Sequence, residues 1–116
     1  MSHDARTTVE ELLAALAVGD LDTVGSLYAD DAELVRYDGA ARGRSEIQAF
    51  YTGYLANHGR YELDRIVDFR AVDDVVLWDA LVTTDEGKLM SYDVAILDDA
   101  GLILRHVPAI RGYWGM

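Results

Sequence analysis

The sequence of 116 residues contains no cysteine and a single proline, Pro108. Without cysteine, the chain forms no disulfide, offers no thiol nucleophile and builds no zinc site from thiolates. Although 51% of the residues are hydrophobic, no uninterrupted apolar run approaches the roughly 18 residues that a membrane span requires. The first residues are polar and lack the apolar core of a secretory signal. We therefore expect a cytoplasmic protein that does not enter a membrane.

Positive charge is also scarce. The chain has 21 Asp and Glu against 10 Lys and Arg, which gives a formal net charge of -11. Its arginines are scattered and form no basic stripe, whereas affinity for nucleic acid or an anionic membrane comes largely from clustered Lys and Arg. We therefore expect neither as a partner. The length fits a single domain over residues 1–116, large enough to bury an apolar core.

The first half of the chain has helical spacing. Apolar residues recur at i, i+3, i+4 and i+7 within residues 9–16, and either Thr7 or Thr8 would pair with the glutamate three residues later in a capping box. Gly19 ends this helix, and Asp20 caps a shorter one that runs through Tyr28.

A third helix is predicted after a short strand over Glu33–Tyr37 and a turn at Asp38–Gly39. Ser45 forms a capping box with Gln48 at its start, and apolar and aromatic residues share one face as far as residue 55.

From Arg60 onward, the pattern is extended. Acidic and glycine-containing turns separate four apolar runs, so consecutive strands form antiparallel hairpins. The four runs are Tyr61–Val72, Val75–Thr84, Lys88–Leu97 and Leu102–Ile110. The predicted order is therefore ααβαββββ, which defines an α+β fold.

Two of these strands are apolar on both faces. Residues 75–78 and 94–97 lack the alternation of polar and apolar residues that a half-solvated strand shows. The helices can cover one face of the sheet. Because no further helix is predicted to cover the other, we expect a second copy of the chain to do so in a homodimer.

Three segments carry a resemblance to a known superfamily. GDLDTVGSLYADDA (residues 19–32), GRSEIQAFY (43–51) and DAGLI (99–103), together with the order of elements, resemble the NTF2-like superfamily, which includes SnoaL-like cyclases, limonene-epoxide hydrolases and ketosteroid isomerases. The resemblance implies a cone-shaped fold in which a strongly curved, mostly antiparallel sheet wraps around the helices. It also implies a pocket for a small hydrophobic molecule, without a cofactor.

Asp93 is the first candidate for chemistry. It interrupts an apolar strand, where a carboxylate is costly to bury unless it is paired, hydrogen-bonded or protonated. In the ketosteroid-isomerase pattern, Asp93 matches the carboxylic acid that hydrogen-bonds a developing oxyanion. An aspartate on a solvated edge, or one in an internal ion pair with an arginine, is the alternative.

The resemblance also places ligand-binding residues. Tyr51 matches a pocket tyrosine of the family, the alternative being a ring that only packs beside Phe50 in the core. Tyr54 shares the helix face of Tyr51, and Trp78 lies in the third-strand region that matches the epoxide-hydrolase pattern. We expect Tyr51, Tyr54 and Trp78, together with Arg36, to bind the ligand.

Two positions depart from the isomerase pattern. The principal catalytic tyrosine of the family falls on Leu12, and its general-base aspartate falls on Arg36, which is permanently charged and cannot accept a proton. Asp38 lies two residues further along and is either a replacement base or an ordinary turn residue. These departures argue against steroid isomerisation in its usual form.

An acid–base dyad is a further hypothesis. The epoxide-hydrolase pattern of an arginine between two aspartates is missing, but Asp79 and His106 lie on strands where both side chains could face the pocket with Asp93. His106 alone could equally be a structural histidine. No histidines stand at metal-binding separation and no phosphate-binding loop is present, so we expect neither a metal nor another cofactor.

Two functions remain from the sequence. The first is a homodimeric pocket protein for a hydrophobic carbonyl or polycyclic compound, acting as a cofactor-independent isomerase, cyclase or lyase through Asp93, Asp79 and His106. The second is a ligand-binding or protein-association module without chemistry.

Overall fold

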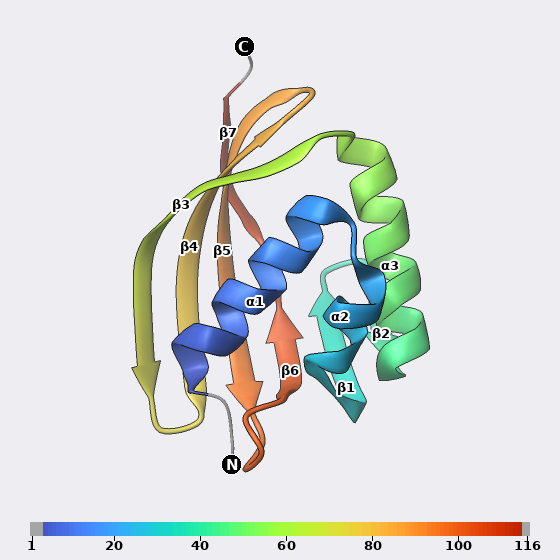
Figure 1. The fold of residues 1–116 in the computed structure, drawn as a ribbon, viewed down its shortest axis with the longest axis vertical. Helices are drawn as coiled ribbons and strands as arrows, with labels where there is room; N and C mark the ends of the chain where they lie inside the picture. The colour runs from blue at the N-terminus through green and yellow to red at the C-terminus, as the bar shows by residue number, and fades with distance from the viewer. Residues whose placement is uncertain (1–3, 115–116) are drawn as a thin grey trace.

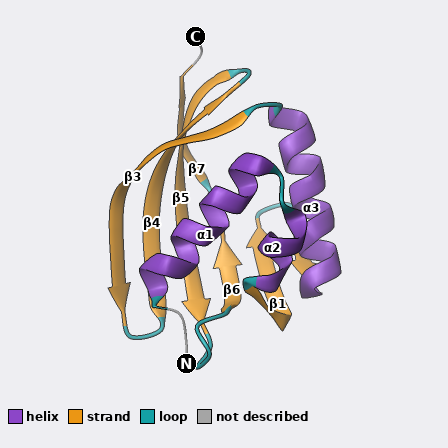
Figure 2. Cartoon of the chain, in the orientation of Figure 1, coloured by secondary structure: helices purple, strands orange, loops and turns teal. Residues whose placement is uncertain are grey.

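The computed structural model describes residues 4–114, and this part of the chain forms three helices and seven strands (Figure 2). The helices are α1 (Ala5–Val18), α2 (Leu21–Ser26) and α3 (Gly43–His58). The strands are β1 (Tyr28–Arg36), β2 (Gly39–Arg42), β3 (Tyr61–Val72), β4 (Val75–Thr84), β5 (Gly87–Leu97), β6 (Ile103–Val107) and β7 (Ile110–Trp114).

The strands form one curved, open sheet in the order β2-β1-β6-β5-β4-β3, with β7 paired to β5. All neighbours are antiparallel except β1 and β6, which are parallel. The sheet wraps around α1, and α3 lies beside β1 (Figure 1). The predicted α+β class and curved, mostly antiparallel sheet are therefore confirmed. None of the helices within residues 4–114 has both the length and the apolar character needed to cross a membrane.

The strand boundaries agree with the sequence prediction in β3–β5 and differ elsewhere. β1 spans Tyr28–Arg36 instead of the predicted Glu33–Tyr37. β3 and β4 have the predicted bounds, and β5 begins one residue earlier than predicted. The single run Leu102–Ile110 is wrong, because the chain divides at Pro108 and Ala109 into β6 and β7. Proline has no N–H to donate to a ladder, so it breaks the strand there. The prediction also missed β2, which forms a hairpin with β1.

The helix caps differ from the predicted capping boxes. Asp4, not Thr7 or Thr8, caps α1, and its side chain accepts a hydrogen bond of 2.9 Å from the backbone N–H of Thr7. α3 begins at Gly43, before Ser45, and its Gln48 side chain donates instead to the carbonyl of Leu21 at 2.8 Å. The apolar face predicted for α1 is buried, and Gly19 ends the helix with φ 71°, as expected of a glycine C-cap.

The register between β4 and β5 decides which side chains face the helices. Trp78 pairs with Asp93, and Asp79 pairs with Tyr92. Because directly paired residues share a face and successive residues alternate, Trp78 and Asp93 lie on the inner face and Asp79 and Tyr92 on the outer one. The outer face also carries half-buried apolar side chains, namely Leu77, Leu81, Met90, Val94 and Ile96.

Candidate functional site

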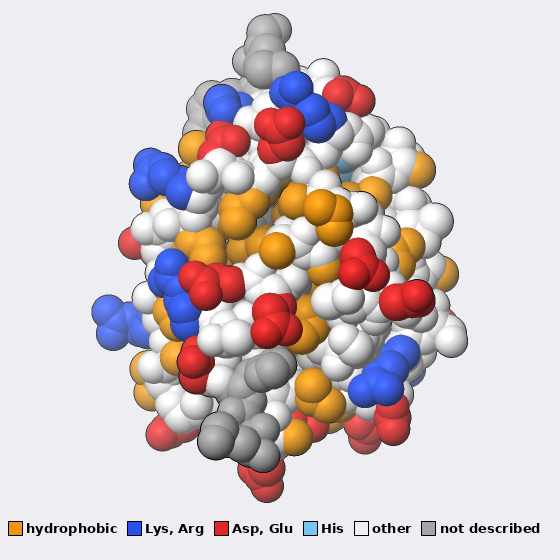
Figure 3. Space-filling model, viewed as in Figure 1, with side chains coloured by type: hydrophobic (Ala, Val, Ile, Leu, Met, Phe, Trp, Pro, Cys, Tyr) orange, Lys and Arg blue, Asp and Glu red, His pale blue; other side chains and the backbone are white. Residues whose placement is uncertain are grey.

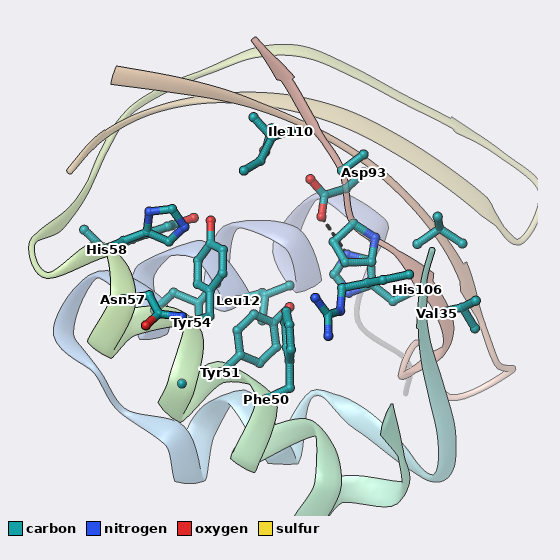
Figure 4. Close-up of a pocket in the computed structure, with 18 of the residues that line it drawn as sticks. Leu12, Val35, Phe50, Tyr51, Tyr54, Asn57, His58, Asp93, His106 and Ile110 are labelled. Atoms are coloured by element: carbon teal, nitrogen blue, oxygen red, sulfur yellow. Dashed lines mark hydrogen bonds and ion pairs between the residues drawn. The ribbon is translucent and has the colours of Figure 1, made fainter. Parts of the chain in front are cut away.

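A cavity of about 990 Å³ opens between α1, α3 and the inner face of the sheet. This volume lies in the range typical of small-molecule sites. Apolar and aromatic side chains make up most of its wall, with a few polar groups among them (Figure 4). The lining includes six of the predicted site residues: Arg36, Tyr51, Tyr54, Trp78, Asp93 and His106.

A chain of short hydrogen bonds runs through the wall of this cavity. His106 Nε2 lies 2.7 Å from Asp93 Oδ2, an interaction drawn as a dashed line in Figure 4. The other ring nitrogen, Nδ1, lies 2.7 Å from the hydroxyl of Tyr28. That hydroxyl is in turn 2.9 Å from the hydroxyl of Tyr51. Four side chains from four different elements therefore form one connected, buried polar network.

The sheet register brings the members of this network together. His106 on β6 pairs with Ala95 on β5, which shares its face with Asp93 two residues away. On its other side, His106 pairs with Leu34 on the parallel strand β1, the strand that begins with Tyr28. Tyr51 approaches from α3, the helix that packs on β1. The pair of Asp93 and His106 is almost fully buried, at 6% and 1% exposure.

Burial fixes the protonation of the two phenols. It raises the pKa of both Tyr28 and Tyr51 well above the ordinary value, so each hydroxyl keeps its proton at neutral pH. A carboxylate can only accept, so the ring proton of a neutral His106 resides on Nε2 and is donated to Asp93. Nδ1 then accepts from the hydroxyl of Tyr28, and the oxygen of Tyr28 accepts from Tyr51. In this order each O–H or N–H of the network donates to an acceptor, except that no acceptor is needed beyond Asp93.

Four buried side-chain atoms of cavity-lining residues lack a hydrogen-bond partner among the described residues, namely Asp93 Oδ1, Trp78 Nε1, Ser91 Oγ and His58 Nδ1. His58 Nδ1 still lies 3.4 Å from a carboxylate oxygen of Glu86, and Asp93 Oδ1 is the oxygen that His106 does not contact. Asp93 and Trp78 are direct partners across β4 and β5. An unpaired buried donor or acceptor is costly, and such atoms in native proteins mark strain, catalysis or an unseen partner. An unpaired acceptor and an unpaired donor therefore belong to neighbouring residues of the cavity wall.

Asp79 does not belong to this site. The hypothesis that it shares a face with Asp93 and His106 is wrong, because the register places it opposite Tyr92 on the outer face of the sheet. It is buried there, at 4% exposure. Trp78, its neighbour in sequence, takes the inward position. The carboxylate that contacts His106 in the cavity is that of Asp93, not that of Asp79.

The sequence analysis missed Tyr28 and assigned it to the second helix. The structure ends α2 at Ser26 and makes Tyr28 the first residue of β1, completely buried. A signal was present, since a tyrosine that is expected in a core needs a partner for its hydroxyl. Asp38 lies in the turn between β1 and β2 with 74% of its side chain exposed, as the turn interpretation predicted.

The remaining predicted residues lie around the network. Tyr54 packs edge-on against Tyr51, with ring centroids 6.2 Å apart, and against His58 at 4.5 Å. Leu12 presents an apolar side chain to the cavity. Arg36 lies over the ring of Phe50, 4.4 Å from its centroid. In the part of the chain that the structure describes, no three His, Cys, Asp or Glu side chains are arranged to hold a metal ion.

Comparison with known proteins relates this chain to one family. The sequence profile of the SnoaL-like domain matches residues 9–106. A relative from Nocardioides simplex, named Steroid Delta-isomerase, is 32% identical over 120 residues, covering 98% of this chain and 92% of that protein.

Solved structures show the same fold at lower identity. IdmH from Streptomyces antibioticus, which has a suggested role as a polyketide cyclase, superposes with a TM-score of 0.80 at 19% identity, covering 94% of this chain and 93% of that chain. A SnoaL-like protein of unknown function from Burkholderia thailandensis E264 gives a TM-score of 0.78 at 19% identity, covering 93% and 95% of the two chains.

Proposed function

Because this chain belongs to the SnoaL-like family of the NTF2-like superfamily, we propose that it is a cofactor-independent isomerase or cyclase acting on a small hydrophobic carbonyl compound. The observation that carries the proposal is the carboxylate of Asp93. His106 holds one of its oxygens at 2.7 Å, while the other is buried without a partner at the wall of an apolar cavity. Functional sites are where such a costly arrangement is tolerated.

The proposed reaction begins with removal of a proton from the carbon next to the ligand carbonyl. Asp93 Oδ1 takes this proton, the C–H electron pair moves into the new C=C bond, and the carbonyl oxygen becomes an enolate. The unpaired N–H of Trp78 donates to that oxygen. Asp93 then returns the proton to another carbon, which completes an isomerisation. In a cyclisation, the enolate carbon instead attacks a second carbonyl carbon of the same ligand, and Asp93 returns the proton to the alkoxide that forms.

The hydrogen-bond network gives the other residues a supporting role. His106 fixes the orientation of Asp93, and Tyr28 fixes the tautomer of His106 by donating to Nδ1. Tyr51 fixes Tyr28 in the same way. The names of the steroid isomerase and of the suggested polyketide cyclase fit this scheme, since both reaction types pass through an enol or enolate.

Hydrogen exchange in D₂O measures the proton-removal step directly. We expect the protein to accelerate exchange of the α-hydrogens of 2-tetralone, a bicyclic apolar ketone, in D₂O, measured by ¹H NMR against the buffer background. On a β,γ-unsaturated ketosteroid we expect turnover far below that of an efficient isomerase, because Leu12 and Arg36 replace the family's catalytic tyrosine and base. Loss of one such group costs about two to four orders of magnitude in rate.

The alternative is a binding module without chemistry, which the replacement of those two groups favours. It predicts that 2-tetralone binds and shifts the tryptophan fluorescence while its α-hydrogens exchange at the buffer rate. This result would overturn the enzymatic proposal and leave the cavity as a ligand site.

We further propose that the chain is a homodimer in solution. The apolar side chains on the outer face of β4 and β5, together with Tyr92 at 41% exposure, would be covered by a second copy. Light scattering at micromolar concentration should give twice the chain mass of 12.8 kDa. A mass equal to that of one chain would contradict the proposal.

A further inference from the structure

Arg36 occupies a particular position relative to the proposed catalytic pair. It ends β1, two residues after Leu34, which pairs with His106 on β6. Residues two apart on a strand share a face and lie about 7 Å apart. Arg36 therefore lies two residues, or about 7 Å, further along the cavity wall than the position of His106. Its side chain is 40% exposed, against 1% for His106, so this step leads from the closed interior to the mouth.

The guanidinium group is held in place but is not saturated. The Phe50 ring supports it at 4.4 Å, a cation–π contact that orients the plane of the group. Its one carboxylate partner among the described residues is Asp38, at 3.3 Å and with 74% of its side chain exposed. A guanidinium has five N–H donors, and an exposed ion pair of this kind is weak. Arg36 therefore has N–H donors available to a ligand at the cavity mouth.

The charge distribution makes this position distinctive. Among the described residues that line the cavity, Arg36 is the only Lys or Arg. The chain as a whole carries a net charge of -11, and Figure 3 shows acidic side chains spread over the viewed face rather than gathered in one patch. An anionic ligand would be repelled by such a protein in general. Arg36 supplies the one arginine or lysine charge of this described lining, beside the exposed carboxylate of Asp38, and so gives an anionic group a local cationic partner.

From this arrangement we infer that Arg36 binds an anionic oxygen of the ligand, so that the substrate is an acidic ketone. Its apolar ring body occupies the cavity, its ketone reaches Asp93 and Trp78, and its carboxylate remains at the mouth on Arg36. An arginine is suited to this because its fork of N–H groups can bind both oxygens of a carboxylate. The inference rests on the proposed function and specifies its substrate class.

The experiment compares a matched pair of neutral and anionic probes. 2-Naphthoate and 2-naphthamide share their ring system and differ in charge. Their affinities are measured by calorimetry for the parent and for the variants R36Q and D38N, with R70Q as the control. Arg70 is an exposed arginine of β3 that does not line the cavity, so its variant changes the net charge equally.

The expected pattern has opposite signs for the two variants. The parent should bind naphthoate more tightly than naphthamide, and R36Q should weaken naphthoate about tenfold while leaving naphthamide unchanged. D38N should strengthen naphthoate about threefold, because it removes the competing carboxylate. R70Q should behave as the parent does. High salt should weaken naphthoate binding alone.

Two results would overturn the inference. One is equal affinity of the parent for the two probes, a result that needs no variant to fold. The other is a loss of naphthoate affinity in R70Q as large as that in R36Q, which would assign the effect to net charge. The α-hydrogen exchange of 2-tetralone, which has no anionic group, tests the proposed function separately. If the protein does not accelerate this exchange while its affinity for naphthoate still depends on Arg36, the cavity binds acids without catalysing enolisation.

Discussion

Replacing Asp93 with asparagine is expected to lower the rate of α-hydrogen exchange in 2-tetralone by about two to four orders of magnitude. Asparagine has nearly the same shape, and its side-chain oxygen can still accept the hydrogen bond that His106 Nε2 gives to Asp93. It cannot accept a proton from carbon. The variant therefore removes the proposed base while keeping the contact that holds it. The measurement is the exchange rate by ¹H NMR, with the melting temperature recorded beside it.

The matched control is Asp79→Asn. It makes the same chemical change at another buried aspartate of the same sheet, on the face turned away from the cavity. We expect this variant to keep the parent's exchange rate. If Asp79→Asn loses as much activity as Asp93→Asn, the assignment of the base to the inner face is wrong. If Asp93→Asn keeps most of the activity, Asp93 acts as a neutral hydrogen-bond donor and another group removes the proton.

Asp93→Leu separates ligand binding from stability. The leucine removes both the charge and the hydrogen-bonding atoms, so a phenolic ligand such as 2-naphthol should bind more weakly by about 1 to 3 kcal/mol. The same change leaves His106 Nε2 without a partner but relieves the buried carboxylate, so we expect the fold to persist. Unchanged binding, or failure to fold, would make Asp93 a structural residue.

The sequence was most informative where one physical constraint dominates. Helix periodicity located the buried face of α1, and the acidic turns located β3 and β4 to the residue. Asp93 also stood out as a charged residue in an apolar strand, and it lines the cavity. Local patterns of this kind need no knowledge of the rest of the chain.

Pairing between strands is not a local property, and the missing parts of the site depended on it. Asp79 and Trp78 are adjacent in sequence, and a shift of register by one residue exchanges which of them faces the cavity. Tyr28 follows a six-residue helix, and only its contacts with Tyr51 on α3 and His106 on β6 reveal its role. These contacts join positions that are 23 and 78 residues apart in the sequence.

The buried phenols also predict steep unfolding at alkaline pH. Burial raises the pKa of Tyr28, Tyr51 and Tyr61 well above the ordinary value, whereas in the unfolded chain each phenol ionises near pH 10. Above about pH 10 the unfolded state therefore releases protons that the folded state retains. The stability that comes from these phenols is fully present below that pH and is lost as the pH rises.

The size of the effect follows from the number of retained protons. Each contributes a slope of about 1.4 kcal/mol per pH unit, so three phenols should lower the free energy of unfolding by about 4 kcal/mol per pH unit above pH 10. Urea unfolding at fixed protein concentration, repeated at several pH values, measures this slope. Tyr28→Phe should reduce it by one proton, to about 2.7 kcal/mol per pH unit, even though the variant is less stable at neutral pH after His106 loses its partner.

The readout is the slope and not the absolute stability, which distinguishes a buried, protonated phenol from one that merely packs well. Tyr37→Phe supplies the control, because the side chain of Tyr37 is fully exposed in the turn after β1, and its slope should equal that of the parent. If Tyr28→Phe and Tyr37→Phe have the same slope, Tyr28 ionises in the folded protein. Burial would then not raise the pKa of Tyr28 above that of an exposed phenol, contrary to the expectation from its position in the core.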